Sequence, residues 1–158
     1  MNAKAKINDI VEAIDFQWND ETHAYFEKST GKVWLLADDI LEAAEENDEE
    51  NIMFDYVEED LEFAKKLIQF PDNFIELPSK YDIDDHSIME DFCSSIENGD
   101  LQHYAFIAIK GKGAFNRFKE LMHYHGLIDD WYKYRDKKIK QQAREWCKFN
   151  KIEYIDIE

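Results

Sequence analysis

Few residues in this chain can interrupt regular secondary structure, and this scarcity constrains the fold more than any other feature of the sequence. The 158 residues include five glycines and two prolines. Glycine and proline are the residues that most often end helices and form tight turns, so their scarcity favours helices over a sheet of many short strands. We therefore predict an α+β protein, a mainly helical single domain with a small antiparallel β-sheet.

Apolar residues recur at helical spacing along much of the chain. The strongest pattern covers residues 55–70 and ends at Pro71. Further helices are predicted over residues 3–14, 86–96, 100–109, 114–125 and 129–150. In the last of these we expect Trp131, Ile139 and Trp146 to lie on one buried face. The acidic stretch 38–51 contains few large apolar residues and is predicted to be an exposed loop or a frayed helix.

Strand patterns are short and lie mostly near the two ends of the chain. Two apolar runs between residues 23 and 36 flank a turn that contains Gly31, which is typical of a β-hairpin. Residues 152–157 alternate apolar and polar side chains, which predicts a C-terminal strand. We expect the hairpin to form the sheet, with the C-terminal strand as a candidate third member.

The length and the cysteine content indicate one cytoplasmic domain over residues 1–158. A chain of this size can bury a core without disulfides, and Cys93 and Cys147 are expected to be reduced. No apolar run approaches the roughly 20 residues that cross a bilayer. The N-terminus has no signal-peptide pattern, so we expect neither secretion nor a membrane partner.

Charge is distributed unevenly along the sequence. The net charge is −17, but residues 1–100 hold 28 acidic and 7 basic residues, whereas residues 101–158 hold 8 and 12. Overall acidity favours solubility and disfavours non-specific binding to nucleic acid or anionic membranes. The reversal of sign indicates that the C-terminal third has an electrostatic character of its own.

A glycine-rich segment, Lys110-Gly-Lys-Gly-Ala114, precedes one predicted helix. Glycines at a helix N-terminus can expose backbone N–H groups, and neighbouring cations add positive charge, a combination that suits a phosphate. The spacing is not that of a P-loop. The same residues also fit a tight turn between helices with solvated lysines, in which Gly113 takes a positive φ. Arg117, in the first turn of the helix, is expected to lie near Lys110 and Lys112.

Residues 103–151 hold 12 Lys and Arg against 5 Asp and Glu, interspersed with aromatic residues. Cations and aromatic rings together can bind phosphates and stack on bases. Alternatively, the lysines solvate helix faces while the rings form the core. Asp82-x-Asp84-Asp85-His86 and Glu120-x-x-His123 resemble metal ligand sets but lack the remaining ligands of known motifs, so we predict no metal and no cofactor.

Three segments of this sequence resemble the corresponding segments of an uncharacterised bacterial protein family. They are Lys110-Gly-Lys-Gly-Ala-Phe-Asn-Arg-Phe-Lys119, Trp131-Tyr-Lys-Tyr-Arg135 and Ala143-Arg-Glu-Trp146. The family is marked by a Gly-Arg/Lys-Gly-Ala-Phe-x-Arg-Phe-Lys motif, and the resemblance extends over most of the chain after residue 20. It implies a bacterial, cytoplasmic protein of unknown function, and it carries no activity to this chain.

Two functional hypotheses follow. The first is a non-enzymatic cytoplasmic binding or regulatory module that contacts a protein or nucleic-acid partner through residues 110–144. The second is an enzyme acting on a phosphorylated small molecule held at the Gly111–Gly113 turn, for which no catalytic residue is predicted. Whether the chain forms a homo-oligomer stays open. The candidate anion-binding or partner-binding residues are Lys110, Gly111, Lys112, Gly113, Arg117, Lys119 and Arg135.

Overall fold

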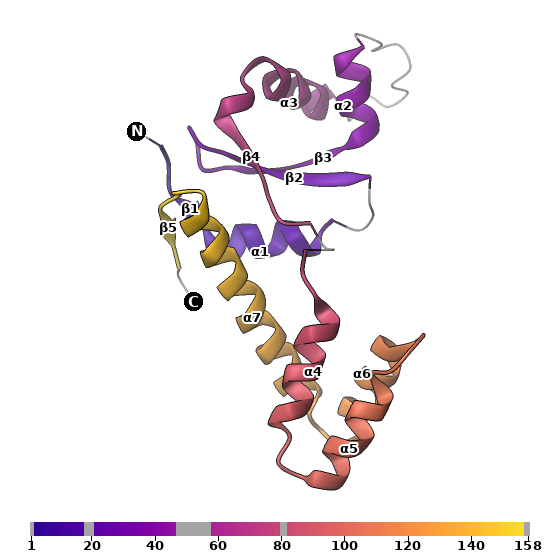
Figure 1. Cartoon of the computed structure of the whole chain (residues 1–158). Helices are drawn as coiled ribbons and strands as arrows, with labels where there is room; N and C mark the ends of the chain where they lie inside the picture. The colour runs from indigo at the N-terminus through magenta and orange to yellow at the C-terminus, as the bar shows by residue number, and fades with distance from the viewer. Residues whose placement is uncertain (1, 18–20, 47–57, 80–81, 157–158) are drawn as a thin grey trace. The chain divides into compact units, whose positions relative to one another are not determined.

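The computed structural model describes residues 2–17, 21–46, 58–79 and 82–156. The chain divides into two compact units, which we call the sheet unit (Met1–Asp82 with Gln142–Glu158) and the helical unit (Ile83–Gln141). Figure 1 shows helices dominating short strands, so the predicted mainly helical α+β class is confirmed. The single domain over residues 1–158 stays a prediction.

The predicted hairpin supplies two strands of a three-stranded antiparallel sheet in the sheet unit, including the central one. Strand β2 (Thr22–Glu27) pairs with β3 (Val33–Ala37) on one side and with β4 (Phe74–Glu76) on the other. Gly31 closes the hairpin with a φ of +77°, and a Cβ there would lie 2.7 Å from the Lys4 carbonyl oxygen. Glycine is therefore required at this turn by both its dihedral angle and the neighbouring backbone.

The C-terminal strand does not join the hairpin, contrary to the expectation for residues 152–157. Strand β5 (Tyr154–Ile155) instead pairs in parallel with β1 (Ala5–Lys6), as a separate two-stranded sheet. Because Ala5 and Lys6 are extended for this pairing, the first helix, α1 (Ile7–Asp15), begins later than residue 3. The third strand of the hairpin sheet is β4, which follows a single 3₁₀ turn, η3 (Pro71–Asn73).

One core of the sheet unit lies between the sheet and two helices, α2 (Asp38–Glu45) and α3 (Glu58–Gln69). The acidic segment predicted as a loop or frayed helix is thus helical over residues 38–45, because Ile40 and Ala44 lie one turn apart and are both buried. The rest of that stretch, and residues 55–57 of the predicted second helix, lie outside the described residues. The ring of Phe63 on α3 stacks on Trp34 of β3 with centroids 4.6 Å apart.

The helical unit contains α4 (Asp85–Ser95), α5 (Gly99–Ala108), α6 (Ala114–Tyr124) and the larger part of α7 (Ile128–Phe149). Side chains of Asp84 and Asn98 cap α4 and α5, as their residue types favour. Aromatic rings from three helices meet in the core: Phe118 lies 4.9 Å from Trp131 and 6.2 Å from Phe92 between ring centroids. This aromatic cluster positions α6 against α4 and α7.

Helix α7 buries a stripe of residues at helical spacing. Trp131 and Ile139 are fully buried, as predicted, and Cys147 continues the stripe with no exposed surface. Trp146 is half-buried rather than fully buried, and its ring meets Phe26 edge-on at 6.2 Å. No helix in the described part of the chain has the length and apolarity that crossing a membrane requires.

Both cysteines are free and buried. Burial raises the pKa of the Cys93 thiol and of the Cys147 thiol to about 11. Because a thiolate forms only near or above the thiol pKa, both groups are unreactive at neutral pH and contribute to packing. The expectation of reduced cysteines agrees with this burial.

Candidate functional site

The glycine-rich segment is a sharp turn between α5 and α6. Gly111 and Gly113 both take left-handed dihedral angles, with φ of +74° and +79°, and Gly113 is the N-cap residue of α6. The prediction of a positive φ at Gly113 is therefore confirmed. Two residues with left-handed dihedral angles, with one residue between them, allow the chain to reverse direction within five residues.

Arg117 holds this turn in place. Its guanidinium donates three hydrogen bonds to backbone carbonyls: from Nε to Ala108 at 3.1 Å, from Nη1 to Lys112 at 2.5 Å and from Nη2 to Lys110 at 2.5 Å. Three of its five N–H donors are thus occupied by main-chain oxygens at the end of α5 and in the turn. Arg117 does lie beside Lys110 and Lys112, as expected, but it contacts their carbonyl groups.

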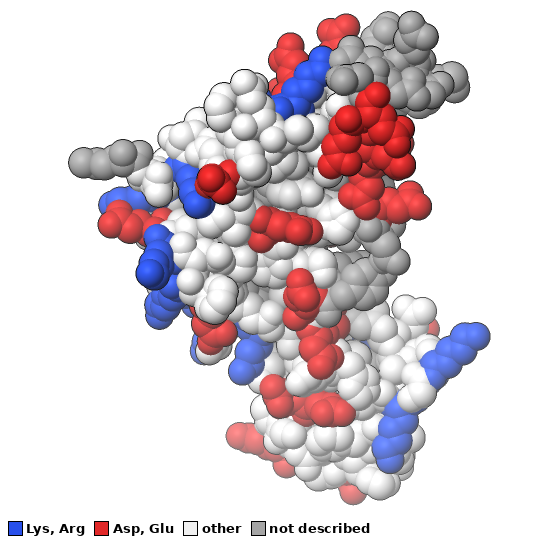
Figure 2. All heavy atoms as spheres, turned by 45° about the horizontal axis from the view of Figure 1, so that its top comes forward, with Lys and Arg blue, Asp and Glu red and all other residues white. Residues whose placement is uncertain are grey.

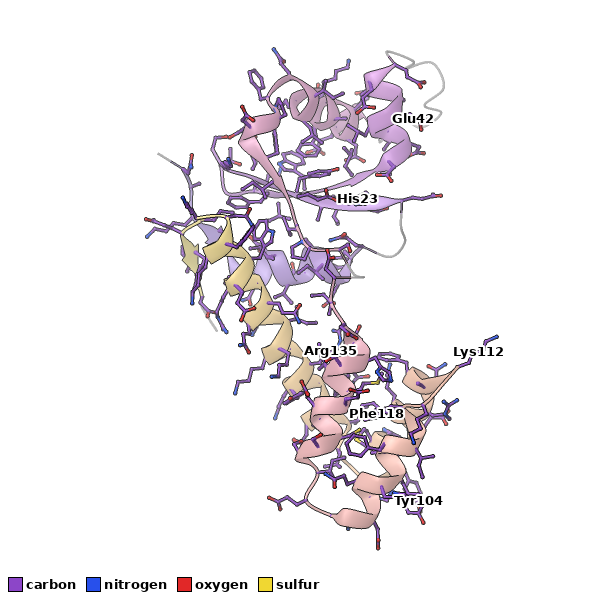
Figure 3. The ribbon with its side chains drawn as sticks, viewed as in Figure 1. His23, Glu42, Tyr104, Lys112, Phe118 and Arg135 are labelled. Carbon is purple, nitrogen blue, oxygen red and sulfur yellow. The ribbon has the colours of Figure 1, made fainter. Side chains whose placement is uncertain are left out.

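The charged heads around the turn come from the lysines. Lys110 and Lys112 are exposed, and Figure 3 shows Lys112 at the tip of the turn, pointing away from the helices. On the next part of α6, the Lys119 ammonium lies 5.1 Å from the ring centroid of Phe115 and 5.9 Å from that of Tyr132 on α7. Both distances are within the reach of a cation–π interaction.

Arg135 makes a different contact, on α7. Its Nε donates to Asp85 Oδ1 at 2.8 Å and its Nη2 to Oδ2 at 3.4 Å, and the two side chains are only 22% and 26% exposed. This forked ion pair joins the first turn of α4 to α7. The structure therefore brings Lys110, Lys112 and Arg117 together at the turn and places Arg135 in a structural pair.

Asp84, Asp85 and His86, which were weighed as metal ligands in the sequence, have structural contacts. Asp84 accepts a hydrogen bond from the Ser87 amide at 3.0 Å as the cap of α4, and Asp85 binds Arg135. His86 lies 2.9 Å from the carbonyl oxygen of Ile109 through its Nε2. Within the described ranges, no group of three or more His, Cys, Asp or Glu side chains could hold a metal ion.

Comparison with known proteins identifies the family. The chain matches an uncharacterised protein family, UPF0158, over residues 5–158. This chain belongs to that family. A UPF0158 protein of Pseudomonas aeruginosa is 30% identical over 67 residues, which cover 42% of this chain and 44% of the relative. No solved structure matches the chain.

Membership of UPF0158 confirms the predicted bacterial family of unknown function. The curated relative is matched over less than half of its own length, so its name adds a family to this chain and no activity. Function therefore has to be argued from the site. The anion-binding role of Lys110, Gly111, Lys112, Gly113, Arg117, Lys119 and Arg135, and the enzyme alternative at the Gly111–Gly113 turn, stay predictions.

The aromatic residues of the helical unit of this UPF0158 chain divide between core and surface. Phe118 and Trp131 are fully buried, which is the structural role considered for the aromatic residues. The rings next to Lys119 are partly open to solvent: Phe115 is 41% exposed and Tyr132 is 48% exposed. Tyr104 on α5 is also exposed and points outward in Figure 3. The structural interpretation of the basic, aromatic segment therefore applies to Phe118 and Trp131, and the binding interpretation stays a prediction for the exposed rings.

Most of the negative charge belongs to the sheet unit. Residues 83–141 hold nine Lys and Arg against ten Asp and Glu, whereas the rest of the chain holds 10 against 26. Figure 2 shows acidic side chains gathered over α2, whose first turn begins with Asp38 and Asp39. The helical unit is therefore close to neutral, and its exposed lysines lie on α7 and in the turn, while Lys119 on α6 is half-buried.

A second polar cluster lies on the sheet unit, around His23 of β2 (Figure 3). The imidazole Nε2 is 3.3 Å from the Asp38 carboxylate, and Nδ1 is 2.9 Å from the Glu76 carboxylate. The Nδ1–Glu76 distance is that of an ion pair, but the two groups are not aligned for a hydrogen bond. Burial, followed by the charges of Glu76, Asp38 and Glu45, raises the pKa of the neighbouring Tyr25 to about 12. The cluster ties β2 to α2 and β4, and the Tyr25 hydroxyl stays protonated at neutral pH.

Proposed function

We propose that this UPF0158 chain is a non-enzymatic, cytoplasmic binding module whose helical unit binds single-stranded nucleic acid. The contacting residues form what we call the lysine–aromatic surface, made up of Lys110, Lys112, Phe115, Lys119 and Tyr132. One observation carries the proposal: the Lys119 ammonium lies against two partly exposed rings from two different helices.

The chemistry of this surface matches what a single strand offers. A flexible strand presents phosphates, which cations bind, and the faces of unstacked bases, which aromatic rings bind by stacking. Phe115 and Tyr132 keep ring surface open to solvent while Lys119 lies beside both. Such a surface tolerates many sequences, because every base has a stacking face.

The acidity of the whole chain does not oppose local binding strongly. Charges farther apart than about 8 Å are largely screened at physiological salt. Most of the excess acidic residues lie in the sheet unit, and the helical unit is nearly neutral. The net charge instead suppresses weak binding elsewhere on the molecule, which favours contact at the lysine–aromatic surface alone.

Fluorescence anisotropy with a labelled single-stranded 15-mer of uridine or thymidine tests the proposal. If Lys110, Lys112 and Lys119 each neutralise one phosphate, log K should fall with log salt with a slope of about −2. Tyr132→Leu removes a stacking surface and should weaken binding at least about fivefold. Lys119→Gln should make the slope less negative by about 0.7.

A matched control is Tyr124→Leu. Tyr124 is 84% exposed on the same helix as Lys119, and its ring lies beside His125 with centroids 5.0 Å apart. This variant should bind the oligonucleotide like the wild type. Absence of binding at low salt, or equal losses in the Tyr124 and Tyr132 variants, would overturn the proposal and leave a protein as the partner to be sought. Sedimentation of the same samples measures the oligomeric state.

A further inference from the structure

A hollow of about 540 Å³ opens on the helical unit, and its lining includes none of the residues of the lysine–aromatic surface. It is formed where the α4–α5 connection lies beside the α6–α7 connection. Its volume falls in the range of small-molecule sites in proteins. The lining residues are Phe92, Ser95, Ile96, Glu97, Asn98, Leu101, His125, Leu127 and Asp130.

The base of the hollow is apolar. Phe92 is buried, and Ile96, Leu101 and Leu127 are half-buried around it. Phe92 belongs to the aromatic core, with its ring 5.6 Å from that of Trp131, so this wall is fixed by packing. A hydrocarbon or aromatic body placed here would bury apolar surface on side chains that are already ordered, which keeps the entropic cost of binding low.

The α4–α5 connection is held by side-chain hydrogen bonds. The Asn98 side-chain oxygen accepts from the amides of Asp100 and Leu101, both at 3.1 Å. Gln102 donates from Nε2 to the carbonyl oxygens of Cys93 at 3.1 Å and Ser94 at 3.2 Å. These bonds fix the backbone that carries Ile96 and Glu97, on one side of the hollow.

The α6–α7 connection is fixed by main-chain geometry. Gly126 takes a φ of +70° after α6, and the Leu127 amide donates to the Met122 carbonyl at 2.8 Å. This is the backbone pattern of a helix that ends in a left-handed glycine. The connection therefore places Leu127 and Asp130 reproducibly, on the other side of the hollow.

The charge of the hollow selects for cations. Glu97 and Asp130 contribute carboxylates from opposite connections, and the described residues that line the hollow include one imidazole, that of His125, and no Lys or Arg. Because two carboxylates face one imidazole in the lining, anions such as phosphates and carboxylates are disfavoured at this position. A positively charged group would gain Coulomb energy, and apolar walls on its other side would strengthen that attraction by excluding water.

We infer that this hollow binds a small organic cation, an amine with an aliphatic or aromatic body. The ammonium group lies between Glu97 and Asp130, and the body packs on Phe92, Leu101 and Leu127. This site is separate from the lysine–aromatic surface in both its residues and the sign of its charge. A failure of nucleic-acid binding would therefore leave this inference unchanged.

Amide chemical shifts of the full chain, followed by NMR during titration, test the inference with three probes of one shape. They are phenethylamine, 2-phenylethanol and 3-phenylpropanoate at pH 7. Phenethylamine should shift the amides of residues 95–101 and 125–130 with a dissociation constant of about 1 mM, which is typical for a ligand of this size. The alcohol should bind at least about tenfold more weakly, since it lacks the charge.

Variants separate the carboxylates from general effects of charge. Asp130→Asn and Glu97→Gln should each weaken phenethylamine binding about threefold or more. Asp129→Asn is the matched control, because Asp129 also lies in the first turn of α7 but does not line the hollow. Far-ultraviolet circular dichroism and thermal unfolding of each variant confirm that it is folded.

Three results would overturn the inference. The first is no shift of these amides up to about 10 mM phenethylamine, tenfold above the expected dissociation constant. The second is equal affinity for the amine and the alcohol, because the carboxylates would then contribute nothing. The third is an equal loss of binding in the Asp129 and Asp130 variants, which would reduce the effect to the overall charge.

Discussion

Gly113→Ala should destabilise the protein more than Gly111→Ala, although the two glycines have nearly the same conformation. Their φ angles are +79° and +74°, so an alanine at either position pays the cost of a left-handed residue, about 1–2 kcal/mol. A Cβ at Gly111 would meet no atom within 4 Å, whereas one at Gly113 would lie 2.9 Å from Arg117 Nη1. The Arg117 contact is therefore the main difference between the two variants, together with the place of Gly113 as the N-cap of α6, where alanine is less favourable than glycine.

The size of the difference follows from what Arg117 would lose. Its Nη1 donates to the Lys112 carbonyl at 2.5 Å, and moving the guanidinium away from a new Cβ breaks this bond. One intramolecular hydrogen bond contributes about 0.5–1.5 kcal/mol net, and this one is at the surface, so about 1 kcal/mol is expected. We expect a loss of about 2–3 kcal/mol for Gly113→Ala and about 1–2 kcal/mol for Gly111→Ala.

Urea unfolding followed by circular dichroism measures both losses, and a double-mutant cycle attributes the difference. In an Arg117→Gln background the guanidinium is absent, so most of the difference between Gly113→Ala and Gly111→Ala should disappear. Equal losses in the wild-type background, or a difference of undiminished size without Arg117, would refute the idea that Arg117 holds the turn. The result bears on function, because this turn presents Lys110 and Lys112.

Three further predictions concern the core and the ion pair. Trp131→Ala should cost about 3–5 kcal/mol in urea unfolding, because the indole is fully buried, and a loss below about 1 kcal/mol would contradict its place in the core. Arg135→Gln should lower the free energy of unfolding by about 1–2 kcal/mol, because Asp85 loses its forked partner. Arg135→Lys should restore only part of that stability, and full restoration by lysine would show that the fork is unimportant. Burial raises both thiol pKa values to about 11, so Cys93 and Cys147 should react with a disulfide reagent at pH 8 far more slowly in the native protein than in urea. The rate in the native protein should still rise above pH 9. Equal rates in the native and denatured protein would contradict the burial of the two thiols.

The candidate site was partly predictable from residue types. Two glycines followed by a helix pattern indicated a reversal of the chain, and Gly113 has the positive φ expected of it. The use of Arg117 was missed, although an arginine in the first turn after a glycine-rich segment can reach back to the open carbonyls of the preceding helix. The Arg135–Asp85 pair had no local signal, because its residues are 50 positions apart.

The local elements could be predicted from residue types and their spacing. Helical periodicity located the helices of the helical unit within a few residues, and the apolar runs around Gly31 located the hairpin, because these patterns express contacts between residues close in the chain. Tertiary structure alone decided that Tyr154 pairs in parallel with Ala5, that α2 packs on the sheet through Ile40, and that Arg135 binds Asp85. The alternation of residues 152–157 predicted a strand but not its partner, because β1 has only two residues and shows no period. An ion pair between distant residues has no periodic signal at all, so such contacts arise only when the folded chain brings the residues together.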